Sequence, residues 1–104
     1  MKIYGTQVKV TIGTINEQLG YDGFYDPNTK TIAINNKLKG DDLTGVVIHE
    51  TIHAIADRLG WRQWLNREME EMLCEQISVA LAENFTMKLK DNSSGRSKRG
   101  KRKV

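Results

Sequence analysis

Two stretches within the first 35 residues alternate between apolar and polar side chains, a period of two that is typical of β-strands with one buried face. In the first stretch the apolar side chains fall at Val8, Val10 and Ile12, with polar residues between them. We therefore expect one continuous strand over 3–12, ended by Gly13.

A second alternation predicts a hairpin before residue 36. The segment 30–35 alternates and is rich in β-branched residues, while 21–25 offers a shorter partner. Between the two segments, Asp26 followed by Pro27 fits the first two positions of a type I turn. We expect 21–25 and 30–35 to pair as antiparallel strands.

After Gly40 the hydrophobic period becomes that of a helix. Apolar side chains then fall at Leu43, Val46, Val47, Ile52, Ile55 and Leu59. Asp41 or Asp42 can cap the start of this helix and complement its dipole, and Gly60 ends it. Because little polar surface surrounds its middle, we expect the helix to be mostly buried.

Asn66 can cap a second helix, which we expect over 67–88. One side carries an apolar stripe of Met69, Met72, Leu73, Ile77, Ala80 and Leu81. The opposite side carries Glu71, Cys74, Glu75, Ser78 and Ala82. Such a helix is expected to contact protein on both sides. We expect Glu68 and Glu70 to be solvated, and the two tryptophans of the link to pack in the core or between the helices.

These elements predict an α+β fold: a small antiparallel or mixed three-stranded sheet, then the two helices. The 104 residues, 38% hydrophobic and 28% charged, suit one domain, which we place at 1–90. No apolar run is long enough for a membrane span, and the N-terminus lacks the apolar core of a secretion signal. A single cysteine, Cys74, cannot form an internal disulfide. We therefore expect a cytoplasmic protein without membrane association.

The net charge of +3 comes from the C-terminal tail. Residues 1–90 hold ten basic and twelve acidic side chains, a net −2, whereas residues 91–104 hold six basic and one acidic, a net +5. The tail has almost no apolar content, so it is expected to be disordered alone. Its basic residues are Arg96, Lys98, Arg99, Lys101, Arg102 and Lys103. They either contact nucleic acid phosphates without sequence selectivity or form a solvated tail, and we give the two readings equal weight.

The candidate chemistry lies within the first helix, where His49-Glu50-Thr51-Ile52-His53 reads H-E-x-x-H. These are the only two histidines of the chain. A spacing of four places both imidazoles on one helical face, where they can bind one zinc ion. Glu50 lies beside them, placed as a general base that activates water. The sequence therefore predicts one Zn²⁺ per chain.

A catalytic zinc site uses three protein ligands, and no third histidine remains to complete it. The third ligand is then a carboxylate or, as a weaker candidate, Cys74. Glu71 and Glu75 both qualify because residues four apart share a helical face. Spacing alone does not choose between them.

His49 and His53, followed by Glu71 on the next helix, resemble the zinc peptidases whose third ligand is a glutamate, the gluzincin-like enzymes. The order of elements, with the hairpin 21–35 before the motif, is similar to the ImmA/IrrE-like family. It is also similar to the small phage- and prophage-encoded relatives of that family. The resemblance covers about residues 20–84 and implies an endopeptidase that acts inside a bacterium.

In that family the third-ligand glutamate begins a pattern like E-x-x-A-N-x-F-A. Here Glu71 begins E-M-L-C-E-Q-I-S, with Cys74 at the alanine position, Glu75 at the asparagine position and Ile77 at the phenylalanine position. The resemblance therefore implies Glu71 as the third ligand, with Glu75 as the alternative.

The hypothesis that follows is a zinc-dependent metallopeptidase with Glu50 as its general base and a peptide or protein as its substrate. Tyr21 or Tyr25 would stabilise the oxyanion. The strand at 31–35, if it lies at the sheet edge, would pair with an extended peptide. The alternative is a catalytically inactive binding or adaptor protein that zinc stabilises, with nucleic acid contacts through its tail.

Overall fold

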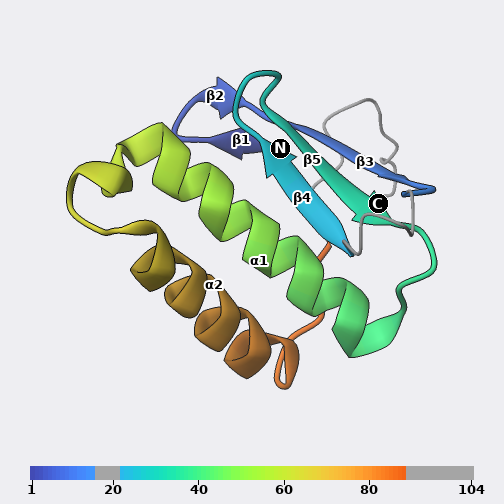
Figure 1. The fold of residues 1–104 in the computed structure, drawn as a ribbon. Coiled ribbons are helices and arrows are strands. Elements are labelled where there is room, and N and C mark those ends of the chain that lie inside the picture. The colour runs from blue at the N-terminus through green and yellow to red at the C-terminus, as the bar shows by residue number, and fades with distance from the viewer. Residues whose placement is uncertain (16–21, 89–104) are drawn as a thin grey trace, which may run out of the picture.

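The computed structural model describes residues 1–15 and 22–88. The strands are β1 (Lys2–Ile3), β2 (Thr6–Gln7), β3 (Lys9–Gly13), β4 (Gly23–Asp26) and β5 (Thr31–Asn35). The helices are α1 (Gly40–Leu59), the short 3-10 helix η2 (Trp61–Gln63) and α2 (Arg67–Ala82). A small sheet packs on one side of α1 and α2 packs on the other, as Figure 1 shows. The expected α+β fold is confirmed.

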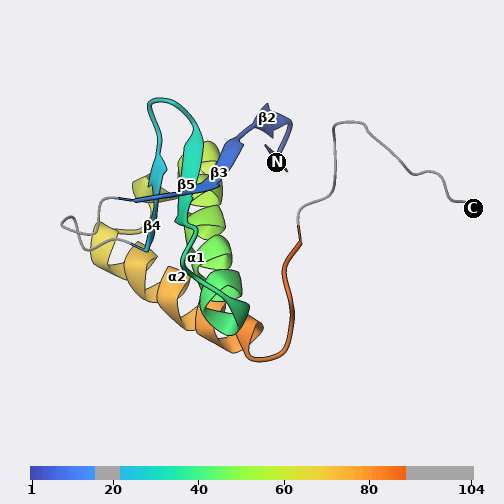
Figure 2. The same cartoon turned by 90° about the vertical axis from the view of Figure 1, so that its right-hand side faces the viewer.

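Strand β5 lies in the middle of a three-stranded mixed sheet, in the order β3-β5-β4. It pairs in parallel with β3 and antiparallel with β4, so the expected hairpin is confirmed. Its inward side chains Ile32 and Ile34 are fully buried. The expectation that 31–35 forms the sheet edge is wrong, because β3 covers the second side of β5. Among the described strands, β4 is the edge that faces the helices (Figure 2).

The predicted strand over 3–12 is interrupted. Tyr4 and Gly5 both adopt positive φ angles, 47° and 82°, and they link β1 to β2 as a two-residue hairpin loop. Two consecutive positive φ angles match the twist of paired strands, and glycine adopts one of them at no steric cost. The hairpin folds back early, and only Lys9–Gly13 continues into the main sheet.

Helix α1 ends where predicted, at Gly60, whose φ of 69° lets its backbone N–H bond the carbonyls of Ala56 and Asp57. Its start differs from the prediction. The N-cap residue is Lys39, which makes no side-chain cap, and Asp41 and Asp42 lie in the first turn. Their charges there complement the helix dipole without capping the helix.

Helix α2 begins as predicted, with the Asn66 side chain accepting from the Met69 backbone N–H at 2.8 Å. It ends at Ala82, six residues before the predicted end. The side chain of Asn84 donates to the Ala80 carbonyl at 2.9 Å. In a longer helix this carbonyl would accept from the backbone N–H of Asn84 instead. The shorter helix still spans about 24 Å.

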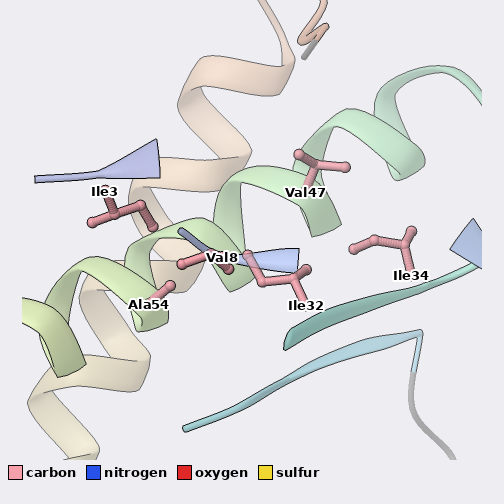
Figure 3. Packing of buried hydrophobic residues seen from close by; sticks show 6 residues of the cluster. All are labelled: Ile3, Val8, Ile32, Ile34, Val47 and Ala54. Carbon is pink, nitrogen blue, oxygen red and sulfur yellow. The ribbon is translucent and has the colours of Figure 1, made fainter. Parts of the chain in front are cut away.

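The core has two parts that meet at α1. Between α1 and the strands, Ile3, Val8, Ile32, Ile34, Val47 and Ala54 pack together (Figure 3). Between α1 and α2, Ile48 and Ile52 pack on Cys74, with Trp61 at the side. A Cβ atom on Gly45 would lie 3.7 Å from the Ala82 Cβ, which shows how closely the two helices approach. The site described below lies along this helix pair.

Helix α2 buries only its small-residue side, at Glu70, Cys74, Ser78 and Ala82. Apart from half-buried Leu73, its apolar stripe is exposed among the described residues, so the expected protein contact on that side stays a prediction. Trp64 is 81% exposed, so the expectation that both tryptophans pack inside is wrong for this one. Neither helix of the described part combines the length and the apolarity that a membrane crossing needs.

Candidate metal centre

The two histidines lie one turn apart on the face of α1 that meets α2. Their ring centroids are 5.0 Å apart and tilted by 56°. Both rings are partly buried, with 19% and 15% of the side-chain surface exposed for His49 and His53. The spacing of four along the helix produces this arrangement, as the sequence predicts.

Helix α2 brings both candidate carboxylates to this pair, but to different nitrogens. The Oε1 atom of Glu71 contacts the Nε2 atom of His53 and lies 3.7 Å from the Nε2 atom of His49. The Oε2 atom of Glu75 lies 3.4 Å from the Nδ1 atom of His49 and reaches no nitrogen of His53 that the structure records. Glu71 is thus the carboxylate that approaches both rings.

A third carboxylate, Glu70, completes the surroundings of His53. It is only 2% exposed, and its Oε2 atom lies 2.6 Å from the Nδ1 atom of His53. Its other oxygen accepts from the Nε atom of Arg62 at 3.3 Å. The expectation that Glu70 is solvated is therefore wrong. A signal for its burial was present in the sequence, because Glu70 lies four and eight residues before Cys74 and Ser78 on the small-residue face.

Glu70 determines what the other side of the His53 ring can bind. When Nδ1–H donates to Glu70, Nε2 carries a lone pair, and this lone pair faces the Glu71 carboxylate. Two acceptors in contact need a proton or a metal cation between them. Carboxylate–histidine–metal arrangements of this kind orient the imidazole in metal sites. The residues present therefore fit a zinc ion.

Glu50 lies next to His49 in sequence and is 8% exposed. Burial raises the pKa of its carboxyl above the ordinary value, the two histidines partly offset this effect, and Glu71 adds to it. A raised pKa favours a carboxylate that accepts a proton during a reaction. The structure thus places Glu50 in the environment that its expected role requires.

Cys74 lies close enough to both imidazoles to compete as a ligand. Each of His49, His53 and Cys74 offers one possible ligand atom, and these three atoms all lie within 4.8 Å of one another. The thiol is fully buried, and burial, followed by the charges of Glu70 and Glu71, raises its pKa to about 12. The thiolate is the species that binds a metal, and a bound cation would itself favour the thiolate, so Cys74 stays a candidate ligand.

The site opens into a cleft of about 660 Å³. The edge strand β4 forms one wall through Gly23, Phe24 and Tyr25. The opposite side is formed by His49, Glu50, His53, Arg62, Arg67, Glu70 and Glu71. A second hollow of about 470 Å³ adjoins the first at His49 and has an acidic lining that includes Asp41, Asp42 and Glu75. The candidate metal ligands therefore lie on an accessible surface beside a strand edge.

The hydroxyl of Tyr25 donates to the Oδ2 atom of Asp57 at 2.8 Å, and Lys30 donates to the same oxygen at 2.8 Å. Burial and this hydrogen bond raise the pKa of Tyr25 above its ordinary value. The hydroxyl thus joins β4 to α1, and its role as oxyanion donor stays a prediction. Tyr21, the other candidate donor, lies outside the described residues.

The six basic tail residues proposed to contact nucleic acid, Arg96 to Lys103, also lie outside the described residues. Comparison with known proteins adds no further assignment. No protein-family model, no curated protein and no solved structure matches this chain. Only the geometry of the site therefore indicates a function for this chain.

Proposed function

We propose that this chain is a zinc-dependent peptidase that holds one zinc ion through His49, His53 and Glu71 and uses Glu50 as its general base. One observation carries the proposal: the Glu71 carboxylate approaches the Nε2 atoms of both histidines, while buried Glu70 holds the far side of the His53 ring. Two imidazoles and one carboxylate are a known ligand set of catalytic zinc sites.

The type of donor favours zinc over harder cations. Imidazole nitrogen suits zinc and other late transition metals, whereas magnesium and calcium prefer oxygen donors. Three protein ligands leave a coordination position for water, which structural sites lack. When bound, zinc lowers the pKa of a coordinated water to about 7 and polarises a carbonyl group.

The protein groups around this site have separate tasks. Glu50 takes a proton from the attacking water and passes it to the leaving amine. Its burial supports this cycle, since a raised pKa brings the carboxyl closer to the proton affinity that the transfer needs. Glu70 holds the His53 ring so that Nε2 faces Glu71.

Strand β4 supplies a way to bind an extended peptide. It lines the cleft, and its only strand partner among the described residues is β5. A peptide that pairs with the edge of β4 opposite β5 would form backbone hydrogen bonds independent of its side chains. This role belongs to β4, because the central position of β5 leaves it no free edge.

A second candidate function follows from Cys74. If its sulfur joins the two histidines and Glu71, the site has four protein ligands and no position for water. Such a closed site stabilises a fold without catalysing hydrolysis, and the chain would then be a zinc-stabilised binding protein.

The test compares the full-length parent with Glu50→Gln, using zinc analysis and cleavage of a mixed library of unstructured peptides. We expect one zinc per chain in both proteins and cleavage only by the parent, because glutamine cannot accept the proton. Glu68→Gln, an exposed carboxylate on α2, is the matched control and should cleave like the parent.

Equal cleavage by Glu50→Gln and the parent would remove Glu50 from the role of base. A parent that binds zinc yet cleaves no library peptide would contradict the peptidase proposal and favour the binding protein.

A further inference from the structure

The cleft beside the proposed metal centre has a cationic end. Arg62, on η2, and Arg67, the first residue of α2, line it next to His53 and Glu70. They are the only lysine or arginine side chains among the described residues that line this cleft. We call Arg62 and Arg67 the arginine pair. Neither has a task in the proposed hydrolysis, so their place in the cleft calls for another role.

Arg62 is held by the same carboxylate that orients the metal site. Its Nε atom donates to the Oε1 atom of Glu70 at 3.3 Å, and the Oε2 atom of Glu70 lies 2.6 Å from the Nδ1 atom of His53. The Arg62 side chain is nevertheless 57% exposed, and only its Nε atom bonds a described residue. Its two terminal nitrogens are therefore free to donate into the cleft. They belong to the planar fork that recognises a carboxylate with two hydrogen bonds.

Arg67 adds a positive charge that the cleft does not balance. It is exposed and makes no hydrogen bond or ion pair with another described residue. When zinc is bound, its two charges offset those of Glu50 and Glu71, and Glu70 offsets Arg62. Among the described lining residues, the charge of Arg67 then has no counter-charge. The loaded cleft attracts an anion at this end.

We infer that the arginine pair binds a carboxylate of the substrate, so that the preferred peptides carry an acidic side chain or a free C-terminal carboxylate near the scissile bond. The inference rests on the proposed function, because it takes the substrate to be a peptide. One carboxylate and one imidazole ring lie between Arg62 and the proposed metal position. At about 3.3 Å per residue of extended chain, the substrate carboxylate falls within about three residues of the scissile bond.

The other end of the site disfavours a carboxylate. The hollow that adjoins the cleft at His49 has an acidic lining that includes Asp41, Asp42, Glu75 and Glu83. No lysine or arginine of the described part of the chain lines this hollow. Like charges repel an anion there, so the two ends of the site select opposite charges on the substrate.

The direction of β4 indicates which side of the peptide carries the carboxylate. Strand β4 and α1 run the same way (Figure 1): a Cβ atom on Gly23 would lie 2.7 Å from the Val46 side chain, whereas Tyr25 bonds Asp57 near the end of α1. Arg62 lies at this second end, where its charge opposes the rise of the Tyr25 pKa that burial causes.

A peptide antiparallel to β4 therefore places its N-terminal side at the arginine pair. Antiparallel pairing is slightly more stable per residue than parallel pairing. We therefore expect an acidic side chain on the N-terminal side of the scissile bond. A free C-terminal carboxylate reaches the arginine pair only if the peptide runs parallel to β4.

The test measures peptide binding by the zinc-loaded, full-length Glu50→Gln variant, which is expected to leave peptides intact. Three libraries of N-acetylated, unstructured peptides compete in equal amounts, and mass spectrometry quantifies the bound fraction. The first library is neutral and amidated, the second adds one glutamate, and the third is neutral with a free C-terminal carboxylate. We expect the glutamate library to bind roughly three- to tenfold better than the neutral one at low salt, with a smaller preference at high salt.

Variants of the arginine pair, made in the same Glu50→Gln background, assign this preference. Arg67→Gln should reduce it at least roughly twofold without leaving a protein group unpaired. Arg62→Gln should also reduce it, and Arg62→Lys should retain part of it, because lysine keeps the charge but loses the fork. Zinc content and thermal unfolding check that each variant is folded. Arg58→Gln is the matched control, because Arg58 donates to the Tyr4 carbonyl and does not line the cleft.

A preference for either charged library that the arginine variants reduce supports the inference, and the library bound better identifies the source of the carboxylate. Equal binding of all three libraries overturns it, as does a preference that survives both glutamine variants of the arginine pair. Cleavage by the parent tests the peptidase separately. Equal cleavage of neutral and acidic peptides would overturn the inference alone. A carboxylate preference in binding, with no peptide cleaved by the parent, would overturn the peptidase proposal and leave the arginine pair as a binding site.

Discussion

At the scale of single residues, the site depends on three neighbouring glutamates that do different things. Glu71 approaches both imidazoles, Glu70 holds the buried side of one ring, and Glu75 reaches only His49. Consecutive Glu70 and Glu71 point about 100° apart, whereas Glu71 and Glu75 share a face and are separated by one turn of rise. The sequence pattern alone could not make this distinction.

The first prediction concerns the third ligand. Glu71→Ala should lower zinc affinity at least roughly a hundredfold, because it removes a ligand. Glu75→Ala should lower it by less than about tenfold, because its side chain is 67% exposed and contacts one ring only. Competition with a chelator measures both constants. The reverse ranking would assign the ligand to Glu75.

A second prediction concerns the carboxylate that the sequence analysis missed. Glu70→Gln keeps an acceptor for the His53 Nδ1–H but loses the charge, so zinc affinity should fall roughly 10–100-fold. The exposed variant Glu68→Gln should bind zinc like the parent. If the Glu70 variant folds and binds zinc with unchanged affinity, Glu70 has only a packing role.

At the scale of elements, the cleft depends on the position of β4 relative to α1. Asp57 near the end of α1 accepts hydrogen bonds from Tyr25 on β4 and Lys30 at the hairpin turn. Burial would raise the pKa of Asp57, but these two hydrogen bonds outweigh it, and the pKa lies below its ordinary value of 3.8. The charged form of Asp57 therefore stabilises the folded state.

The third prediction is a pH dependence of stability. The pKa of Asp57 is lower in the folded state than in the unfolded chain, so the unfolded chain binds the proton more readily. The charged carboxylate therefore stabilises the folded state fully above the ordinary pKa of 3.8. This stabilisation is lost as the pH falls through the folded-state value. Asp57→Asn should cost about 1 kcal/mol at pH 7, a modest amount because Lys30 is half-exposed.

Urea unfolding of the parent and Asp57→Asn at a series of pH values measures this difference. The gap in free energy of unfolding should shrink as the pH falls below about 4, towards the folded-state pKa. Asp22→Asn, an exposed carboxylate before β4, should show no such gap. A gap that is constant across this range would show that the Asp57 charge does not stabilise the fold.

Elements with local signals could be predicted from the sequence. Gly60 ends α1 and Asn66 caps α2 because each signal lies within a few residues of the boundary. The Tyr4–Gly5 turn is not apparent from the alternation, although it joins two adjacent strands. The central position of β5 cannot be predicted locally, because it depends on pairing with β3, which is distant in sequence. Glu70 shares a helical face with Cys74 and Ser78, but only the fold shows that this face packs on α1.

At the scale of the whole molecule, a sheet edge, a buried helix and a second helix together form one cleft that contains the proposed zinc ligands. The identity of the metal ligands decides between the two proposed functions. Two histidines with Glu71 leave a coordination position for water, whereas the addition of Cys74 closes the site.

The most direct measurement is the X-ray absorption spectrum of the zinc-loaded, full-length chain at the zinc edge. We predict one zinc with nitrogen and oxygen neighbours at about 2.0–2.2 Å, two of them imidazoles, and no sulfur. Cys74→Ala should give the same spectrum. A sulfur neighbour at about 2.3 Å that disappears in Cys74→Ala, or a chain that binds no stoichiometric zinc, would contradict the proposed centre.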